Sequence, residues 1–238
     1  MCSALVHQQG RLAGGTTSSP LDRKTEAIAA IVRERIGSPI LRLLVVGCGS
    51  GVEAATLARQ LGAQVVGIDL RDSFDPSAAA AADLRQGDAT HLEFADRAFD
   101  FVYSYHVLEH IPDYARALAE MHRVLKKGGS YLVGTPNRLR LVGYLGSAGV
   151  SWRDKLAWNV ADWKARLRGR FRNEHGAHAG FSSAELRGIL EKVFGRIEEI
   201  TARYYLSVYR PYAWLVRFLA RSGLGRFLFP AVYFMGTK

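Results

Sequence analysis

The sequence VVGCGSG at residues 45–51 stands between a short apolar run that begins at Ile40 and a helix-forming segment that ends at Leu61. A short apolar run that ends in glycines is typical of a strand buried on both faces of a parallel sheet. Glycines let the backbone turn sharply and let a ligand lie against it where a Cβ would collide. The stretch therefore predicts a strand, a loop for a nucleotide-like ligand and a helix in direct succession.

The glycine spacing excludes two common phosphate-binding loops. A dinucleotide fingerprint needs G-x-G-x-x-G, whereas this loop has G-x-G-x-G and Val52 stands at the sixth position. The loop contains no Lys followed by Ser or Thr, which excludes a P-loop. Taken alone, the glycines are equally well explained by a tight strand-to-helix turn.

Two aspartates strengthen the prediction of a ligand site. Asp69 ends the next apolar run, 18 residues beyond Gly51, where an acid can accept hydrogen bonds from ribose hydroxyls. Asp88 follows the presumed third strand, where its carboxylate can accept from the exocyclic amine of adenine. Together with the glycine loop, these residues predict a site for a nucleoside without phosphates.

Strand-like and helical segments alternate along the chain. The expected helices cover 21–36, 52–61, 76–84, 113–125 and 182–193, and the expected strands cover 40–46, 64–69, 99–104, 130–135, 196–205 and 231–235. Such alternation predicts a parallel sheet with helices on both faces. We expect a flexible N-terminus over residues 1–20 and a single domain over residues 21–238.

The composition is that of a folded chain, because 48% of its 238 residues are apolar. The two cysteines, Cys2 and Cys48, cannot form a disulfide framework. The first residues lack a basic start followed by a long apolar run and a small-residue cleavage site. We therefore expect a cytoplasmic protein.

The net charge of +10 is concentrated in the last two-fifths of the sequence. Residues 1–137 hold 14 Lys and Arg against 15 acids, whereas residues 138–238 hold 18 against 7. The excess coincides with two expected insertions into the domain, at about 138–174 and 206–229. Such asymmetry indicates either an anionic partner or a solvated basic face.

The insertions are aromatic as well as basic, since Trp152, Trp158 and Trp163 lie among nine basic residues in 138–172. This combination suits peripheral contact with an anionic membrane, here the inner membrane. The rival is RNA, whose bases stack on aromatic residues, but no RNA-binding module is recognisable and we expect no nucleic-acid partner. A third interpretation is a lid and a homodimer surface with the tryptophans in the core. Arginines interrupt 209–229 too often for a spanning helix.

Ordered motifs in the first part of the chain resemble those of class I S-adenosylmethionine-dependent methyltransferases. The motifs are Gly47-Cys48-Gly49-Ser50-Gly51, Val66-Gly67-Ile68-Asp69, Gly87-Asp88-Ala89, Phe99-Asp100-Phe101-Val102, Val107-Leu108-Glu109-His110-Ile111-Pro112-Asp113 and Leu125-Lys126-Lys127-Gly128-Gly129. The resemblance runs over about residues 40–137. It implies a Rossmann-like three-layer α/β sandwich with a seven-stranded, mostly parallel sheet whose last strand is antiparallel.

The same resemblance implies an enzyme with S-adenosylmethionine as its cofactor. The residues that it assigns to the cofactor are the loop residues Gly47, Cys48, Gly49 and Gly51, then Asp69 for the ribose, Leu70, Asp88 and Ala89 for the adenine, and Ser104 and Tyr105 after the fourth strand.

A looser resemblance concerns the acceptor. Thr135-Pro136-Asn137-Arg138, the long insertion, His178 to Phe181 and Ala184-Glu185-Leu186 are similar to the ubiquinone-biosynthesis O-methyltransferase group and its relatives that act on lipid-like substrates. This implies O-methylation of a small-molecule or lipid-like acceptor by in-line displacement. The alternatives are an RNA methyltransferase that uses the basic C-terminal part, and a non-catalytic S-adenosylmethionine-binding protein.

His106, Glu109 and His110 lie just beyond the fourth expected strand, at the edge where open α/β sheets bind ligands. A histidine there can take the proton of a phenol or hydroxyl, or His110 can merely brace the turn that follows it. The resemblance suggests a divalent ion held by Glu109 and His110, but two adjacent ligands do not make a metal site and we expect none. His175 and His178 lie on a loop that either closes over the substrate or is a solvated turn.

Overall fold

Seven strands form one sheet in the computed structural model, which describes residues 20–36, 39–144, 149–173 and 179–238. The strands are β1 (Arg42–Val46), β2 (Gln64–Asp69), β3 (Asp83–Gln86), β4 (Phe99–Tyr105), β5 (Leu125–Pro136), β6 (Ile197–Glu199) and β7 (Ala231–Thr237). Their order is β3-β2-β1-β4-β5-β7-β6. The first five pair in parallel, and β7 runs antiparallel to both β5 and β6. The expected sheet with an antiparallel last strand is confirmed.

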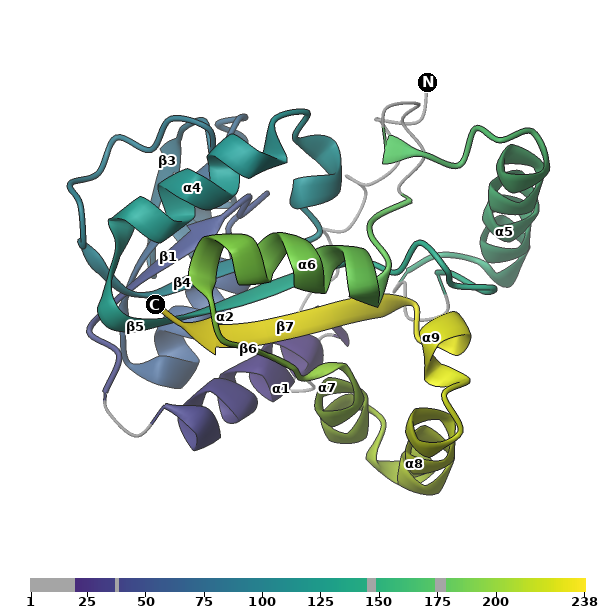
Figure 1. Ribbon diagram of the computed structural model, residues 1–238. Coiled ribbons are helices and arrows are strands. Elements are labelled where there is room, and N and C mark those ends of the chain that lie inside the picture. The colour runs from purple at the N-terminus through teal and green to yellow at the C-terminus, as the bar shows by residue number, and fades with distance from the viewer. Residues whose placement is uncertain (1–19, 37–38, 145–148, 174–178) are drawn as a thin grey trace.

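Helices cover both faces of the sheet, which makes the three-layer sandwich that the sequence predicts (Figure 1). They are α1 (Pro20–Arg35), α2 (Val52–Leu61), α3 (Pro76–Ala79), η1 (Leu108–His110), α4 (Tyr114–Val124), α5 (Trp152–Leu167), α6 (Ser183–Phe194), α7 (Thr201–Val208), η3 (Arg210–Tyr212), α8 (Ala213–Arg221) and α9 (Gly225–Leu228). The helices α4 and α6 lie on one face, and α1, α2 and α7 lie on the other.

The side chains of β1 alternate between the two cores that these helices cover. Leu43 and Val45 pack with α1, α2 and α7, whereas Leu44 and Val46 pack with α4 and α6. All four side chains are at most 1% exposed. Burial of such a side chain contributes about 1.5–3 kcal/mol, so the apolar run before the glycines is a central strand because both of its faces are covered.

One segment differs from the prediction near the sheet edge. The helix expected over 76–84 is only the single turn α3, which is capped by the carboxylate of Asp75. Residues 83–86 instead form β3, which pairs in parallel with β2. The sequence presumes a third strand before Asp88 but gives it no bounds, because this strand lies at the edge of the sheet and its mostly exposed side chains leave no apolar alternation.

A second difference lies near the C-terminal end. The strand expected over 196–205 has three residues, and the helix α7 replaces it from Thr201 onward. This helix places Tyr204 and Tyr205 in the core, so tertiary packing overrides the preference of aromatic residues for strands. The strand β5 also begins earlier than expected, at Leu125.

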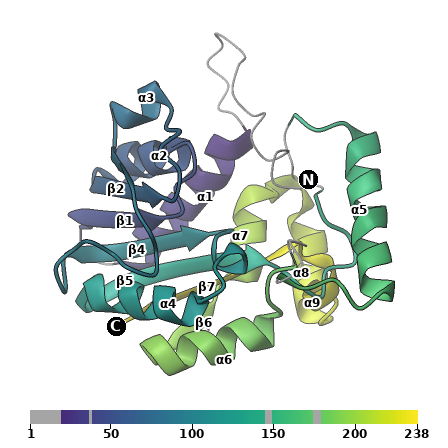
Figure 2. The ribbon, with the colours of Figure 1, turned by 90° about the horizontal axis from the view of Figure 1, so that it is seen from above.

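Both expected insertions lie at the same end of the molecule. The helix α5 follows β5, and α8 and α9 precede β7; two views place all three helices at the end where the parallel strands finish (Figures 1 and 2). The second insertion was expected to begin at about residue 206, which lies within α7, because that helix runs from Thr201 to Val208. The inserted helices therefore border the carboxyl edge of the sheet.

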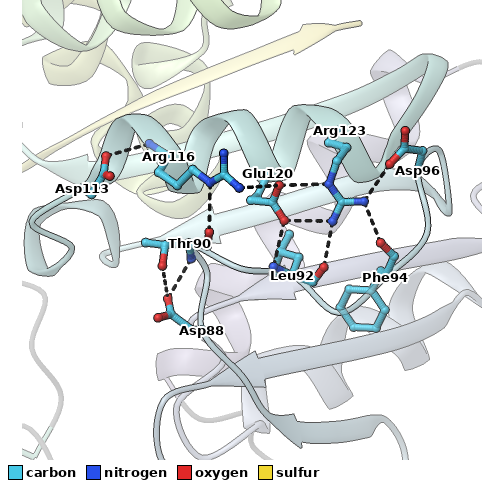
Figure 3. A network of polar contacts seen from close by, with 9 residues as sticks. All are labelled: Asp88, Thr90, Leu92, Phe94, Asp96, Asp113, Arg116, Glu120 and Arg123. Atoms are coloured by element: carbon cyan, nitrogen blue, oxygen red, sulfur yellow. Dashed lines mark hydrogen bonds and ion pairs between the residues drawn. The ribbon is translucent and has the colours of Figure 1, made fainter.

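A polar network holds the loop after β3 against α4 (Figure 3). Glu120 accepts a hydrogen bond from the backbone N–H of Leu92 at 2.9 Å and pairs with Arg123 at 2.8 Å. The Arg123 guanidinium also donates to the carbonyl oxygens of Leu92 and Phe94. Because these bonds satisfy backbone groups of the loop, the network fixes the path of the chain that follows Asp88.

Replacing Glu120 with Gln should make stability less sensitive to acid. Hydrogen bonds from Arg123 lower the pKa of the Glu120 carboxyl from 4.5 to about 2. Its stabilising effect is therefore complete above the unfolded pKa and is lost as the pH falls through the folded one. In urea titrations, the advantage of wild type over Glu120→Gln in unfolding free energy should shrink by about 2 kcal/mol between about pH 6 and pH 2.

The matched control for this experiment is Glu93→Gln, since the Glu93 side chain is exposed. Its difference from wild type should stay small throughout the titration. An advantage of wild type over Glu120→Gln that does not change with pH would contradict the role of the network.

Candidate cofactor and active site

The ends of β1, β2 and β4 lie side by side at the carboxyl edge of the sheet. Val46 of β1 pairs with Ile68 of β2 and with Ser104 of β4. The backbone N–H groups of Gly47 and Cys48 both donate to the carbonyl oxygen of Ile68, at 2.8 and 2.9 Å. The glycine loop is therefore a neighbour of the residues that follow β2 and β4, as the strand order predicts.

The glycine loop is joined to Asp69 by a direct hydrogen bond. The N–H of Gly49 donates to Oδ2 of Asp69 at 2.9 Å, and Oδ1 accepts from the N–H of Arg71 at 3.2 Å. Gly49 has a φ of +54°, and no atom lies within 4 Å of the position that a Cβ would take. Open space thus lies over the loop beside a half-buried carboxylate, and this arrangement fits a ligand that carries ribose hydroxyls.

The two flanking glycines of the loop have structural roles. A Cβ at Gly47 would lie 2.1 Å from Cγ2 of Val107, so this glycine permits a close approach between the loop and the segment after β4. Gly51 is the residue from which α2 starts. The loop is therefore packed closely at Gly47 and Gly51, and Gly49 is the position with open space beside it.

The residues expected near the adenine differ in exposure. Leu70 is 66% exposed, and the exposed Asp88 accepts from both the N–H and the hydroxyl of Thr90, at 2.8 Å each. These hydrogen bonds lower the pKa of the Asp88 carboxyl, which is therefore ionised near neutral pH. Ala89 and Cys48 are largely buried, and burial raises the pKa of the Cys48 thiol to about 12. Leu70 and Asp88 are thus open to a ligand, and the Cys48 thiol is neutral.

The end of β4 carries the last two residues expected at the cofactor. Ser104 is 1% exposed, and its hydroxyl has no hydrogen-bond partner among the described residues. The half-buried Tyr105 stacks on Tyr233 and tilts against His106, with ring centroids 5.4 and 4.0 Å apart. A buried hydroxyl without a protein partner at this edge is a group that a bound ligand or ordered water would satisfy.

Two histidines flank a buried glutamate directly after β4. Oε1 of Glu109 lies 3.9 Å from Nδ1 of His106 and 3.9 Å from Nε2 of His110. The Glu109 side chain is fully buried, whereas both imidazoles are about half exposed. The short helix η1 creates this arrangement, because it places Glu109 and His110 in one turn immediately after the strand. The structure thus brings together the three residues that the sequence predicts as catalytic.

The Glu109 carboxyl is unusual because it is buried beside two imidazoles and has no hydrogen-bonded side-chain partner among the described residues. Burial raises its pKa from 4.5 to about 8, against opposing effects of its own backbone and of Arg140. Neither oxygen has a hydrogen-bond partner within the part of the chain that the structure describes. Such a carboxyl is mainly neutral at pH 7, and a strongly shifted group next to a ligand edge is typical of functional sites.

Metal ligation has no support in residues 20–36, 39–144, 149–173 and 179–238, where no group of three or more His, Cys, Asp and Glu side chains is placed to hold an ion. His175 and His178, which the sequence places on a loop near the substrate, lie outside the described residues.

Two charged residues near the edge, the half-buried Glu53 and the buried Arg140, escaped the sequence prediction. Glu53, in the first turn of α2, accepts a hydrogen bond from the hydroxyl of Tyr103 at 2.7 Å, and burial raises its pKa. Arg140 is 4% exposed and pairs with Asp162 of α5 at 2.9 Å. An acid directly after a glycine loop is a weak signal for Glu53, and nothing local in the sequence points to the partner of Arg140.

Comparisons with known proteins identify relatives of this domain. Residues 44–133 match the family model described as a methyltransferase domain. The chain is 35% identical over 155 residues to a ubiquinone biosynthesis O-methyltransferase of Cereibacter sphaeroides, a match that covers 60% of this chain and 62% of that protein. It is 36% identical over 117 residues to one of Pseudomonas aeruginosa, covering 45% and 49%. The chain therefore spans less than two thirds of the length of either relative.

Two solved structures have a similar fold. Phosphoethanolamine N-methyltransferase 2 of Haemonchus contortus, in complex with S-adenosyl-L-methionine, has a TM-score of 0.55 and 21% identity, and the match covers 90% of this chain and 52% of that one. The cyclase SpnF has a TM-score of 0.52 and 20% identity, covering 88% and 78%. The two names denote different reactions, so this likeness concerns the fold alone.

Replacing Glu109 with Gln should stabilise the protein at alkaline pH relative to wild type. Because the folded pKa of about 8 exceeds the unfolded 4.5, folding takes up a proton between these values, and wild type loses stability as the pH rises through them. Gln cannot ionise, so the variant does not lose stability in this way as the pH rises. The unfolding free energy of wild type, minus that of Glu109→Gln, should therefore fall by up to about 1.4 kcal/mol per pH unit.

Urea titrations at several pH values between about 5 and 9 would measure this difference. Glu120→Gln is the matched comparison, since its carboxyl is shifted in the opposite direction. The unfolding free energy of wild type minus that of Glu109→Gln should fall across this interval. If the difference stays constant or rises with pH, the Glu109 carboxyl is not buried and neutral.

Proposed function

The chain contains a class I S-adenosylmethionine-dependent methyltransferase domain, and on this premise we propose that it methylates a hydroxyl group of a small-molecule or lipid-like acceptor. We choose oxygen as the atom that accepts the methyl group because two half-exposed imidazoles lie on either side of Glu109. They stand at the same sheet edge as the glycine loop and Asp69. Relatives that carry the name O-methyltransferase support the same choice.

The residues assigned to the cofactor are those that the carboxyl edge gathers. Within the described residues, the Asp69 carboxylate accepts from the N–H groups of Gly49 and Arg71, and it has further lone pairs for the ribose hydroxyls. The exposed side chain of Leu70 would cover the adenine, with Asp88 and Ala89 beside it. When bound, S-adenosylmethionine supplies a methyl group on a positively charged sulfur. A nucleophile that attacks the methyl carbon in line takes the group, and S-adenosylhomocysteine leaves.

The task of the protein is to orient the acceptor and to take its proton. A phenol or alcohol loses the proton of its hydroxyl as the oxygen is methylated, and imidazole is the side chain that gains and loses protons near neutral pH. His106 is our candidate for this general base, because it directly follows β4 and its ring lies against Tyr105. His110, one turn later on η1, is our candidate for orienting the acceptor.

Glu109 would couple the two imidazoles. While both are neutral, burial keeps the Glu109 carboxyl neutral as well. When one imidazole takes a proton, its positive charge favours the ionised carboxylate 3.9 Å away. The buried acid would thereby stabilise the protonated base, with no exposed anion in the resting site.

Labelled methyl transfer tests the acceptor class. The full chain would be incubated with methyl-tritiated S-adenosylmethionine and one of three acceptors: an alkyl-substituted catechol, an amine of the same size, or total RNA. We expect label in the catechol as an ether, and His106→Asn should lower kcat by about a hundredfold. His110→Asn should chiefly raise KM for the acceptor.

Transfer to the amine or to RNA instead of the catechol would reject O-methylation. Unchanged kcat in His106→Asn would reject that residue as the base. Calorimetric titration of each variant with S-adenosylhomocysteine provides the control, because neither substitution should change cofactor affinity.

Replacing Asp69 with Asn should weaken cofactor binding by about tenfold or more, since it removes charge-assisted hydrogen bonds to the ribose. Asn keeps an oxygen that can accept from Gly49, so the loop should remain folded. Asp72→Asn, which alters an exposed carboxylate three residues further on, should bind normally. Calorimetry with S-adenosylmethionine measures both affinities, and equal values for the two variants would remove Asp69 from the site.

A further inference from the structure

The helix α5 carries an apolar stripe on its outer side. The stripe consists of Trp152, Leu156, Val160, Trp163 and Leu167, which recur at intervals of four, four, three and four residues. Their exposed fractions are 69%, 56%, 44%, 42% and 85%, and no residue of α5 is buried. At 3.6 residues per turn the five side chains share a sector about 80° wide. A surface helix normally turns such a stripe toward the core, and α5 does the opposite.

Polar groups hold α5 to the protein. The amide of Asn159 bonds both the N–H and the carbonyl oxygen of Gly143, at 2.7 and 3.1 Å. Asp162 pairs with the buried Arg140 and accepts from the hydroxyl of Tyr144. These polar groups attach the helix along one edge of the stripe, and the side chains of the stripe remain exposed. The expectation that the tryptophans of this insertion lie in the core is therefore wrong for Trp152 and Trp163.

Basic residues border the stripe. At 100° per residue, Arg153, Lys164 and Arg168 follow one side of it. On the other side, Arg166 donates to the carbonyl oxygen of Arg140 at 2.9 Å and so belongs to the attachment of the helix. The two acids of the helix, Asp154 and Asp162, lie about 80° or more from the stripe, and Asp162 is already paired with Arg140. An apolar stripe with tryptophan and flanking positive charge is the pattern of a helix that lies in the interface of a lipid bilayer.

We propose that α5 docks the protein onto the surface of an anionic membrane through this stripe. A second copy of the chain is a poorer occupant, because two copies would bring their flanking basic residues together. An anionic bilayer supplies both the apolar interior for the stripe and negative charge for its borders. No helix among the described residues is long and apolar enough to cross a membrane.

The neighbouring surface has the same character. Leu141, whose carbonyl oxygen accepts from the indole N–H of Trp163 at 3.1 Å, is 41% exposed, and Val142 is 39% exposed. At the same end of the molecule, α8 exposes Trp214 and Phe218. These residues enlarge the apolar surface, but the stripe on α5 is longer and is the element to which we assign docking.

Flotation of the full chain with vesicles tests this assignment. We expect binding to phosphatidylcholine vesicles that contain phosphatidylglycerol, weaker binding in high salt, and little binding to phosphatidylcholine alone. The variant Trp152→Ser/Leu156→Ser/Leu167→Ser leaves the contacts of Asn159 and Asp162 intact. It should lower the partition coefficient by about tenfold or more. Arg153→Gln/Lys164→Gln/Arg168→Gln should lower it by a similar factor at low salt only.

Trp214→Ser/Phe218→Ser on α8 is the matched control and should retain most of the binding. Equal binding to neutral vesicles, no loss in either α5 variant, or a loss confined to the α8 variant would overturn the proposal. Total RNA is the competitor for the nucleic-acid alternative. If it releases the wild-type protein from vesicles, and if the α5 variants do not bind it, the proposal would be overturned in favour of a nucleic-acid surface. Circular dichroism of each variant verifies folding. The assay involves no methyl transfer, so its outcome is independent of the proposed reaction.

Discussion

The hydrogen bond from Gly49 to Asp69 is the contact on which the site depends. It joins the ends of two parallel strands, and it does so because Gly47 and Cys48 also bond to the end of β2. The central position of β1 makes this possible, since apolar cover on both faces fixes the strand. Two backbone bonds to Ile68 and one bond to the Asp69 carboxylate therefore hold the loop, and the space above Gly49 stays open.

The sheet could be predicted from the sequence wherever apolar side chains mark both faces. β1, β2 and β4 have that pattern. The helices α4 and α6 could be predicted because apolar residues recur along their buried faces. The bounds of β3 escaped prediction because an edge strand with exposed side chains carries no such signal. α7 was predicted as a strand because its tyrosines favour strands. Tyr204 instead stacks on Tyr233 of β7, and this tertiary contact is made from a helix.

The site was predictable to the extent that it follows strand ends. The glycine loop, Asp69, His106 and Glu109 all come directly after a strand, and a parallel sheet necessarily brings such residues to one edge. Burial was not predictable. Nothing local distinguishes Glu109, which is sealed from solvent, from the exposed histidines on either side of it, because its burial arises from residues distant in the sequence.

The two insertions have a consequence for how such a protein can diversify. The residues assigned to the cofactor all lie before residue 106, whereas α5 and α8 belong to the later, basic part of the chain. The residues assigned to the cofactor and the exposed surface of the inserted helices thus belong to separate stretches of the polypeptide. Mutation could remodel the later stretch to serve a new cellular surface, and the earlier stretch would keep its geometry throughout.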